Sequence, residues 1–258
     1  MCQPRKWLKT AICCPERAVD WLDWPPTGLR FGQSLAAAVA NPRPTMSASA
    51  TAHLLAPLSS LLEEVVGATR VVDVELVQAL WGGYGQLVRC RLEGGSQTSV
   101  IVKHVRWPTS QNHPRGWNSD RSHQRKVHSN EVETSWYQDH ASLCGPGCRV
   151  PKCFAVRSLG DEVFIVLEDL DVAGFPARRT RVSDVELMTC LSWLANFHAT
   201  FMGHAPEGLW EVGTYWHLAT RPDELAVLES GPLKHGAAEI DRKLSASPFL
   251  SLVHGDAK

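Results

Sequence analysis

The hydrophobic pattern of this chain changes period near Ser183, from that of strands to that of helices. Before Ser183, β-branched and alternating segments bounded by turn residues predict five strands. They span residues 69–80, 86–92, 99–105, 150–156 and 163–167. After Ser183, apolar residues recur at helical spacing, and Ser183 and Glu186 match a helix capping box. The pattern therefore predicts an α+β fold with a strand-rich part followed by a helical part.

Helices are predicted on both sides of this change. Residues 53–66 and 122–141 carry apolar residues at helical spacing within the strand-rich part, and residues 222–229 and 233–245 do so later. The helix that begins at Ser183 has an apolar stripe that we expect to be buried, made of Leu187, Leu191, Leu194, Ala195, His198 and Phe201. On such a stripe, His198 is expected to be a hydrogen-bonded core residue rather than a metal ligand.

The chain divides into three parts. Six prolines interrupt any helix in the first of them, so residues 1–50 are expected to be a loosely ordered extension. Residues 51–170 form the strand-rich domain, and residues 171–258 form the helical part.

The charge and cysteine content exclude some classes of protein. A formal net charge of −1 gives no reason to expect nucleic acid or an anionic membrane as a partner. No apolar run approaches the roughly 20 residues of a membrane helix. Eight scattered cysteines without a secretory signal favour a reduced, cytoplasmic location. A zinc site at His140, Cys144, Cys148 and Cys153 is a weak alternative, because no paired C-x-x-C motif is present.

A glycine-rich turn separates the first two predicted strands. Gly82, Gly83 and Gly85 flank Tyr84 within it. Glycines allow backbone N–H groups to approach a phosphate closely. A plain hairpin turn without a ligand is the alternative.

Lys103 lies inside the apolar third strand. Burying its ammonium group is costly unless an anion meets it, although a lysine at a strand end can also extend to water. The following helix offers Glu131 and Glu133 as partners. Glu133 lies one turn before Tyr137, so the two share a face that the aromatic ring can anchor to the sheet.

Two further segments carry acidic residues next to apolar runs. The fifth strand leads directly into Glu168, Asp169 and Leu170. The last apolar run leads into His254 and Asp256. A carboxylate held at the edge of a core, as at Asp256, can accept a proton from an alcohol that attacks a phosphoryl group.

Five motifs in this order, "VIVKHV", "EVETSWY", "VFIVLEDL", "LANFHATF" and "LVHGDAK", resemble the protein-kinase-like fold. The branch is that of small-molecule kinases, with aminoglycoside phosphotransferases, choline kinases and ecdysteroid-kinase-like proteins. The resemblance covers residues 76–258. It implies a five-stranded antiparallel N-lobe with one main helix over residues 51–170, then the first, helical part of a C-lobe over residues 171–258.

The resemblance implies ATP and Mg²⁺ as cofactors and a small-molecule alcohol as acceptor. Gly82, Gly83 and Gly85 would cover the phosphates of ATP. Lys103 would hold the α- and β-phosphates and pair with Glu133. The hinge, whose backbone groups bind adenine, would be Glu168, Asp169 and Leu170.

The same resemblance makes Asp256 the residue that accepts the acceptor's hydroxyl proton, with His254 supporting the loop. The family pattern continues to an asparagine and a metal-binding aspartate, whereas this sequence ends two residues after Asp256. We therefore expect no metal ligands here, impaired phosphotransfer, and apolar helix surface left exposed by a truncated C-lobe. A truncated isoform that acts as a non-catalytic interaction module is the alternative function. A fragment without activity is a third possibility.

Overall fold

The computed structural model describes residues 8–9, 48–80, 83–107, 120–179, 181–215 and 217–255. The expected loose extension over residues 1–50 lies mostly outside this part of the chain. Within it, a short strand β1 (Leu8–Lys9) is described, and helix α1 (Ala48–Val66) already begins at Ala48.

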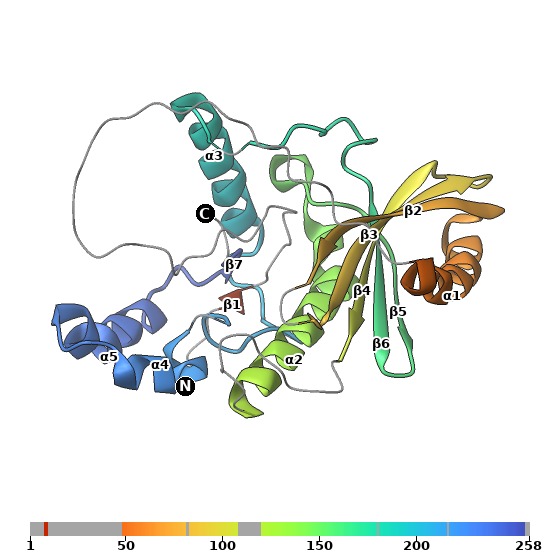
Figure 1. The fold of residues 1–258 in the computed structure, drawn as a ribbon. Coiled ribbons are helices and arrows are strands. Elements are labelled where there is room, and N and C mark those ends of the chain that lie inside the picture. Colours follow the sequence, from red (N-terminus) through yellow and green to blue (C-terminus); the bar gives the residue numbers. More distant parts are fainter. Residues whose placement is uncertain are drawn as a thin grey trace, which may run out of the picture.

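A five-stranded antiparallel sheet forms the centre of the strand-rich part (Figure 1). Its strands follow the order β2-β3-β4-β6-β5. They are β2 (Arg70–Ala79), β3 (Gly85–Glu93), β4 (Ser99–Arg106), β5 (Cys153–Leu159) and β6 (Glu162–Glu168). All four pairings are antiparallel, as the resemblance implied.

Two cores cover the two faces of the sheet, with α1 and α2 on opposite sides (Figure 1). On the α1 side, leucines such as Leu58 and Leu62 pack against Val100 and Val102 of β4. Because side chains alternate along a strand, Ile101 and Lys103 belong to the opposite face. There, the residues paired with Lys103 on the neighbouring strands are Leu87 and Ile165. The sheet therefore presents Lys103 within an otherwise apolar row.

The predicted helix over residues 122–141 is divided in the structure. Helix α2 (Asp120–Ser135) continues into a π-helical turn (Trp136–His140) and a 3₁₀ turn (Ala141–Leu143). The adjacent Trp136 and Tyr137 are both buried, and the Trp136 ring contacts Phe197 and Phe201. A second 3₁₀ turn (Pro146–Cys148) then leads to β5.

Helix α3 (Asp184–Thr200) confirms the predicted capping box but not the predicted buried stripe. The Ser183 hydroxyl accepts a hydrogen bond from Glu186 N, and the Glu186 carboxylate accepts one from Ser183 N. Leu187 and Leu191 are 45% and 47% exposed, and Ala195 is exposed as well. Of the predicted stripe, Phe201 is buried, and Leu194 and His198 are half-buried. Phe197, which was not predicted, is buried as well, because this end of the helix meets the aromatic core around Trp136.

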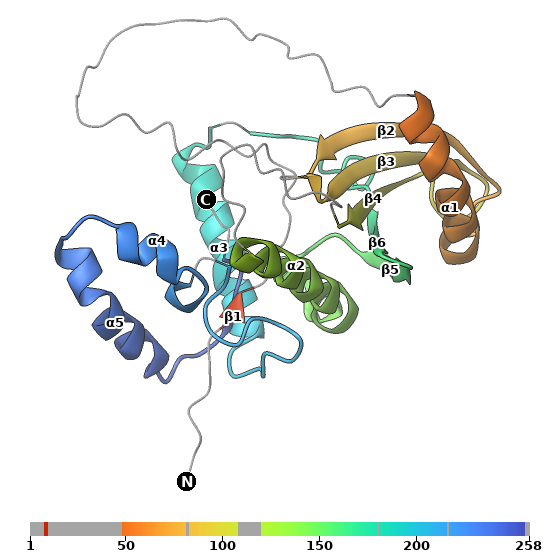
Figure 2. The ribbon, with the colours of Figure 1, turned by 60° about the horizontal axis from the view of Figure 1, so that its bottom comes forward.

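The rest of the helical part packs loosely. Helices α4 (Pro222–Val227) and α5 (Pro232–Ser245) contain no buried residue, and Figure 2 shows them far from the sheet with α2 between. Large apolar side chains are exposed there, including Val227, Leu228, Leu233 and Leu244.

The last described segment returns to extended structure. Strand β7 (Leu252–Val253) pairs in parallel with β1, a contact between the two ends of the chain that the sequence did not predict. None of the helices in the described part of the chain has the length and hydrophobicity to cross a bilayer.

Candidate functional site

Lys103 and Glu133 form a buried ion pair between β4 and α2. Lys103 Nζ donates to Glu133 Oε2, and the two residues are only 6% and 5% exposed. This confirms the predicted pairing. The alternative in which Lys103 extends to water is wrong, and so is Glu131 as partner, since Glu131 is exposed and lies 3.0 Å from His128 Nδ1.

This pair is costly to bury. Desolvating two charges can outweigh their attraction, so a buried ion pair is weak evidence of a stability role. In addition, Glu133 Oε1 is buried and has no hydrogen-bond partner among the described residues. An unsatisfied buried acceptor costs about 1–3 kcal/mol. The fold therefore carries a polar feature here that its own packing does not require.

The glycine turn is a hairpin between β2 and β3, in which Leu80 N donates to Gly85 O at 2.9 Å. Gly83 has a φ of +79°, and a Cβ atom there would come within 4 Å of none of the described residues beyond its chain neighbours. Gly85 has a φ of +125°, and a Cβ atom there would overlap His104 O of β4. The glycine at 85 is thus required by strand packing, whereas at 83 the described residues give only the positive φ as a reason for glycine. Gly82 lies outside the described residues.

Tyr84 connects this turn to helix α2, a link that the sequence analysis missed. Its hydroxyl lies 2.6 Å from His123 Nδ1, and the two rings are 5.8 Å apart. Burial, together with nearby Tyr215, raises the pKa of Tyr84. Helix α2 therefore contacts both the turn, through His123, and Lys103, through Glu133.

The predicted hinge residues have side chains with structural roles. The Glu168 carboxylate accepts two hydrogen bonds from Arg149 Nη2, at 2.7 and 2.8 Å. The Leu170 carbonyl accepts from Phe175 N at 2.8 Å. Adenine contacts through the backbone of this segment remain a prediction.

Asp169 is the most constrained of these residues, since only 3% of it is exposed. Its carboxylate accepts from Arg89 Nε at 2.8 Å, Ser99 Oγ at 2.7 Å and Asp171 N at 3.1 Å. Burial acts to raise the pKa of Asp169, but the hydrogen bonds from Arg89 and Ser99 outweigh it and hold that pKa below its ordinary value.

Arg89 joins this segment to the sheet, and sequence reasoning did not identify it. Besides Asp169, its guanidinium contacts Asp171 Oδ2 at 2.5 Å and Glu75 Oε2 at 3.5 Å. Arg178 contacts the other oxygen of Asp171 at 2.6 Å. Ion pairs therefore link strands β2 and β3, which carry Glu75 and Arg89, to the hinge segment. An arginine in a strand pattern gives no local sign of such distant partners.

His254 lies at the end of β7 and is buried against α3. Its ring meets Trp193 edge-on, with centroids 5.8 Å apart. Nearby, the carbonyl of His198 accepts a hydrogen bond from Ser251 Oγ at 2.7 Å, and burial lowers the pKa of the half-buried His198 ring. Asp256, the predicted proton acceptor, lies outside the described residues.

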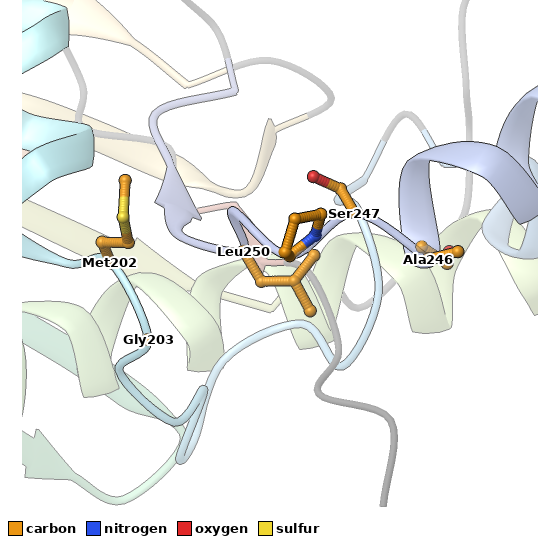
Figure 3. A pocket seen from close by; sticks show the side chains of 7 residues that line it. Met202, Gly203, Ala246, Ser247 and Leu250 are labelled. Carbon is orange, nitrogen blue, oxygen red and sulfur yellow. The ribbon is translucent and has the colours of Figure 1, made fainter.

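A pocket of about 290 Å³ lies elsewhere, in the helical part. Figure 3 shows it between the segment after α3, at Met202 and Gly203, and the segment after α5, at Ala246, Ser247 and Leu250. Its lining contains no charged side chain. It is therefore unsuited to binding phosphate groups.

No group of three or more His, Cys, Asp or Glu side chains in the described ranges could hold a metal ion. The zinc alternative thus has no support, and His140 Nε2 lies 2.9 Å from the carbonyl of Glu207 instead. No family model, curated protein or solved structure matches this chain, so any assignment of function depends on the geometry given above.

Proposed function

We propose that residues 51–170 bind a nucleotide, and that the chain is related to ATP-dependent kinases of small-molecule alcohols with a protein-kinase-like fold. The observation that carries the proposal is the buried Lys103–Glu133 pair. It lies on the strand next to the glycine hairpin, and its two residues come in the order that the resemblance implies.

The chemistry of the pair supports this role. A lysine ammonium is a compact charge with three donors, and one of them is committed to Glu133 Oε2. The carboxylate fixes the direction of the lysine side chain, so that the ammonium can meet a phosphate without first losing conformational freedom.

Phosphotransfer would follow from positioning. The acceptor oxygen would attack the terminal phosphorus of ATP in line, ADP would leave, and the hydroxyl proton would pass to Asp256. His254, held against Trp193, would support the loop that carries Asp256. The proposal assigns no residue to Mg²⁺.

A non-catalytic interaction module is the second candidate. It is favoured by the exposed apolar side chains of α3, α4 and α5, among them Met188, Val227 and Leu233. Contiguous exposed apolar surface on a folded chain is typical of interaction sites. In that case nucleotide binding would persist without turnover.

Calorimetric titration of the full chain with ATP and with adenosine tests the proposal. We expect Lys103→Met to weaken ATP binding by about tenfold or more, equal to about 1.4 kcal/mol, and to leave adenosine binding nearly unchanged. Because Lys103→Met leaves Glu133 buried and unpaired, the double variant Lys103→Met/Glu133→Gln provides a version without that charge.

Lys243→Met on the exposed face of α5 is the matched control, since it removes one lysine charge far from the pair. Circular dichroism confirms that each variant is folded. Equal ATP affinity in the wild type and the folded double variant would exclude the proposed nucleotide site. Release of ADP in the presence of candidate alcohols then separates the enzyme from the interaction module.

A further inference from the structure

Two arginines from distant segments converge on one carboxylate beside helix α2. Arg125 lies in the second turn of α2, and Arg221 immediately precedes α4. Arg125 Nη2 donates to Glu224 Oε1 at 3.1 Å, and Arg221 Nε donates to the same oxygen at 3.0 Å. One carboxylate oxygen therefore serves two guanidinium groups, although a guanidinium group can form paired hydrogen bonds with two oxygens of one anion.

Arg125 is the more deeply placed of the two, because only 8% of it is exposed. Its Nη1 donates to the carbonyl of Thr220 at 2.7 Å, but its Nε is buried and has no hydrogen-bond partner among the described residues. An arginine side chain stays charged at any ordinary pH. A buried cation with an unpaired donor is costly, so the packing around Arg125 leaves a demand for a further acceptor.

The ring of Tyr215 orients both guanidinium groups. The Cζ atoms of Arg125 and Arg221 lie 5.0 and 5.6 Å from the centroid of this ring, which is the distance of a cation–π contact. Glu224 is held less firmly, because its side chain is 40% exposed and can turn out into water. The two cations are thus fixed in place, whereas the carboxylate between them can be replaced.

We propose that Arg125, Tyr215 and Arg221 form a binding site for a phosphate group, either free phosphate or the phosphate of a small phosphomonoester. The ligand displaces the Glu224 carboxylate and offers several oxygens where the two arginines now share one. Arginine suits this ligand because the planar fork of its donors matches the geometry of phosphate. The site is separate from the proposed nucleotide site at Lys103 and does not depend on it.

A bound phosphate group would tie two parts of the chain together. Arg221 belongs to the segment that leads into α4, whereas Arg125 belongs to the helix that also carries Glu133. On the same helix, His123 contacts Tyr84 of the glycine turn. Binding therefore strengthens the contact between the α4 region and α2, and the thermal stability of the folded chain reports it.

Thermal unfolding of the full chain in graded inorganic phosphate tests the inference, with sodium chloride at equal ionic strength as the reference. A ligand that binds only the folded state raises the unfolding midpoint as its concentration exceeds Kd. We expect this rise with phosphate and not with chloride. Glycerol phosphate is titrated in parallel. Binding of either ligand supports the site, and the one that binds more tightly identifies the source of the phosphate group.

Glu224→Gln is the decisive variant, because it removes the competing charge and keeps the size of the side chain. We expect it to bind phosphate about tenfold more tightly than the wild type. Asp223→Asn is the matched control, since the neighbouring Asp223 is 68% exposed and pairs with Arg121 instead. Its phosphate affinity should change by less than about twofold. Arg221→Gln, shown by circular dichroism to be folded, should lose the stabilisation by phosphate.

Three results would overturn the inference. One is an equal gain in phosphate affinity in Asp223→Asn and Glu224→Gln, which would show a general effect of charge. Another is an unfolding midpoint in phosphate that equals the midpoint in sodium chloride for both the wild type and Glu224→Gln. The third comes from the double variant Lys103→Met/Glu133→Gln, which should keep its stabilisation by phosphate. Its loss would place the phosphate at the nucleotide site, against this inference but in favour of the proposed function.

Discussion

Replacing Asp169 by asparagine tests whether the charge network around Arg89 holds the hinge segment to the sheet. Asparagine keeps the size of the side chain and one carbonyl oxygen with two lone pairs, so it can still accept two of the four present hydrogen bonds. The other bonds, among those from Arg89 Nε, Arg89 Nη2 and Ser99 Oγ, lose their acceptor. The bonds that are kept go to a neutral oxygen instead of a charged one. Arg89 still contacts Asp171 and Glu75, so no arginine charge is left alone.

The size of the effect follows from these contacts. A hydrogen bond to a charged group contributes about 1.5–3 kcal/mol, and two such bonds are lost. We expect Asp169→Asn to lower the free energy of unfolding by about 3 kcal/mol near neutral pH.

The loss in free energy of unfolding caused by Asp169→Asn should depend on pH. The pKa of Asp169 is lower in the folded chain than its ordinary value of 3.8, so the folded state binds this proton more weakly than the unfolded state. The stabilisation is therefore present above that value and is lost as pH falls through the folded pKa. The difference between wild type and variant should shrink in acid.

Urea denaturation at about pH 7 and about pH 3 measures both quantities, because the midpoint and slope give the free energy of unfolding. Asp161→Asn is the control, since Asp161 is exposed in the β5–β6 turn. A variant within about 0.5 kcal/mol of wild type at neutral pH would refute the assigned role of the network. A difference in free energy of unfolding between wild type and Asp169→Asn that grows as pH falls would also refute this role.

Two further predictions concern the turn and the helical core. Gly85→Ala should destabilise the fold by about 3 kcal/mol or more, because a Cβ atom there overlaps His104 O, whereas Gly83→Ala should cost about 1 kcal/mol from its positive φ alone. Thermal unfolding compares them, and equal losses would contradict the packing argument. Phe197→Ala should cost about 4 kcal/mol and the exposed Leu191→Ala less than about 1 kcal/mol. Chemical denaturation measures both, and a larger loss at Leu191 would restore the originally predicted stripe.

The sheet could be predicted because its signal is local. Alternation along residues 99–105 identifies a strand, and a lysine inside an apolar strand demands an anion, which the next helix supplies at Glu133. Periodicity and the cost of burying charge pointed to a partner on this helix, Glu131 or Glu133, and the resemblance selected Glu133. They do not depend on knowing how distant segments fold.

The Asp169 network and the face of α3 could not be predicted in this way. Arg89 and Asp169 are separated by 80 positions, so nothing local connects them. In α3, periodicity shows that Leu187 and Leu191 share a face, as Phe197 and Phe201 also do. It cannot say which face a distant tryptophan, Trp136, will cover.

The π-helical turn at Trp136–His140 also has a meaning for how this sequence can change over evolution. A π turn spans one residue more per hydrogen bond than an α-helix, which is the signature of a single inserted residue. Removing that residue would restore regular α-helical hydrogen bonding and leave the segments on either side in nearly the same relative orientation, because the π turn is what absorbs the extra residue. Removing a residue from the regular part of α2 would instead rotate everything after it by about 100° and turn the buried Trp136 and Tyr137 away from the core. A deletion of one residue should therefore be better tolerated at the π turn than earlier in α2.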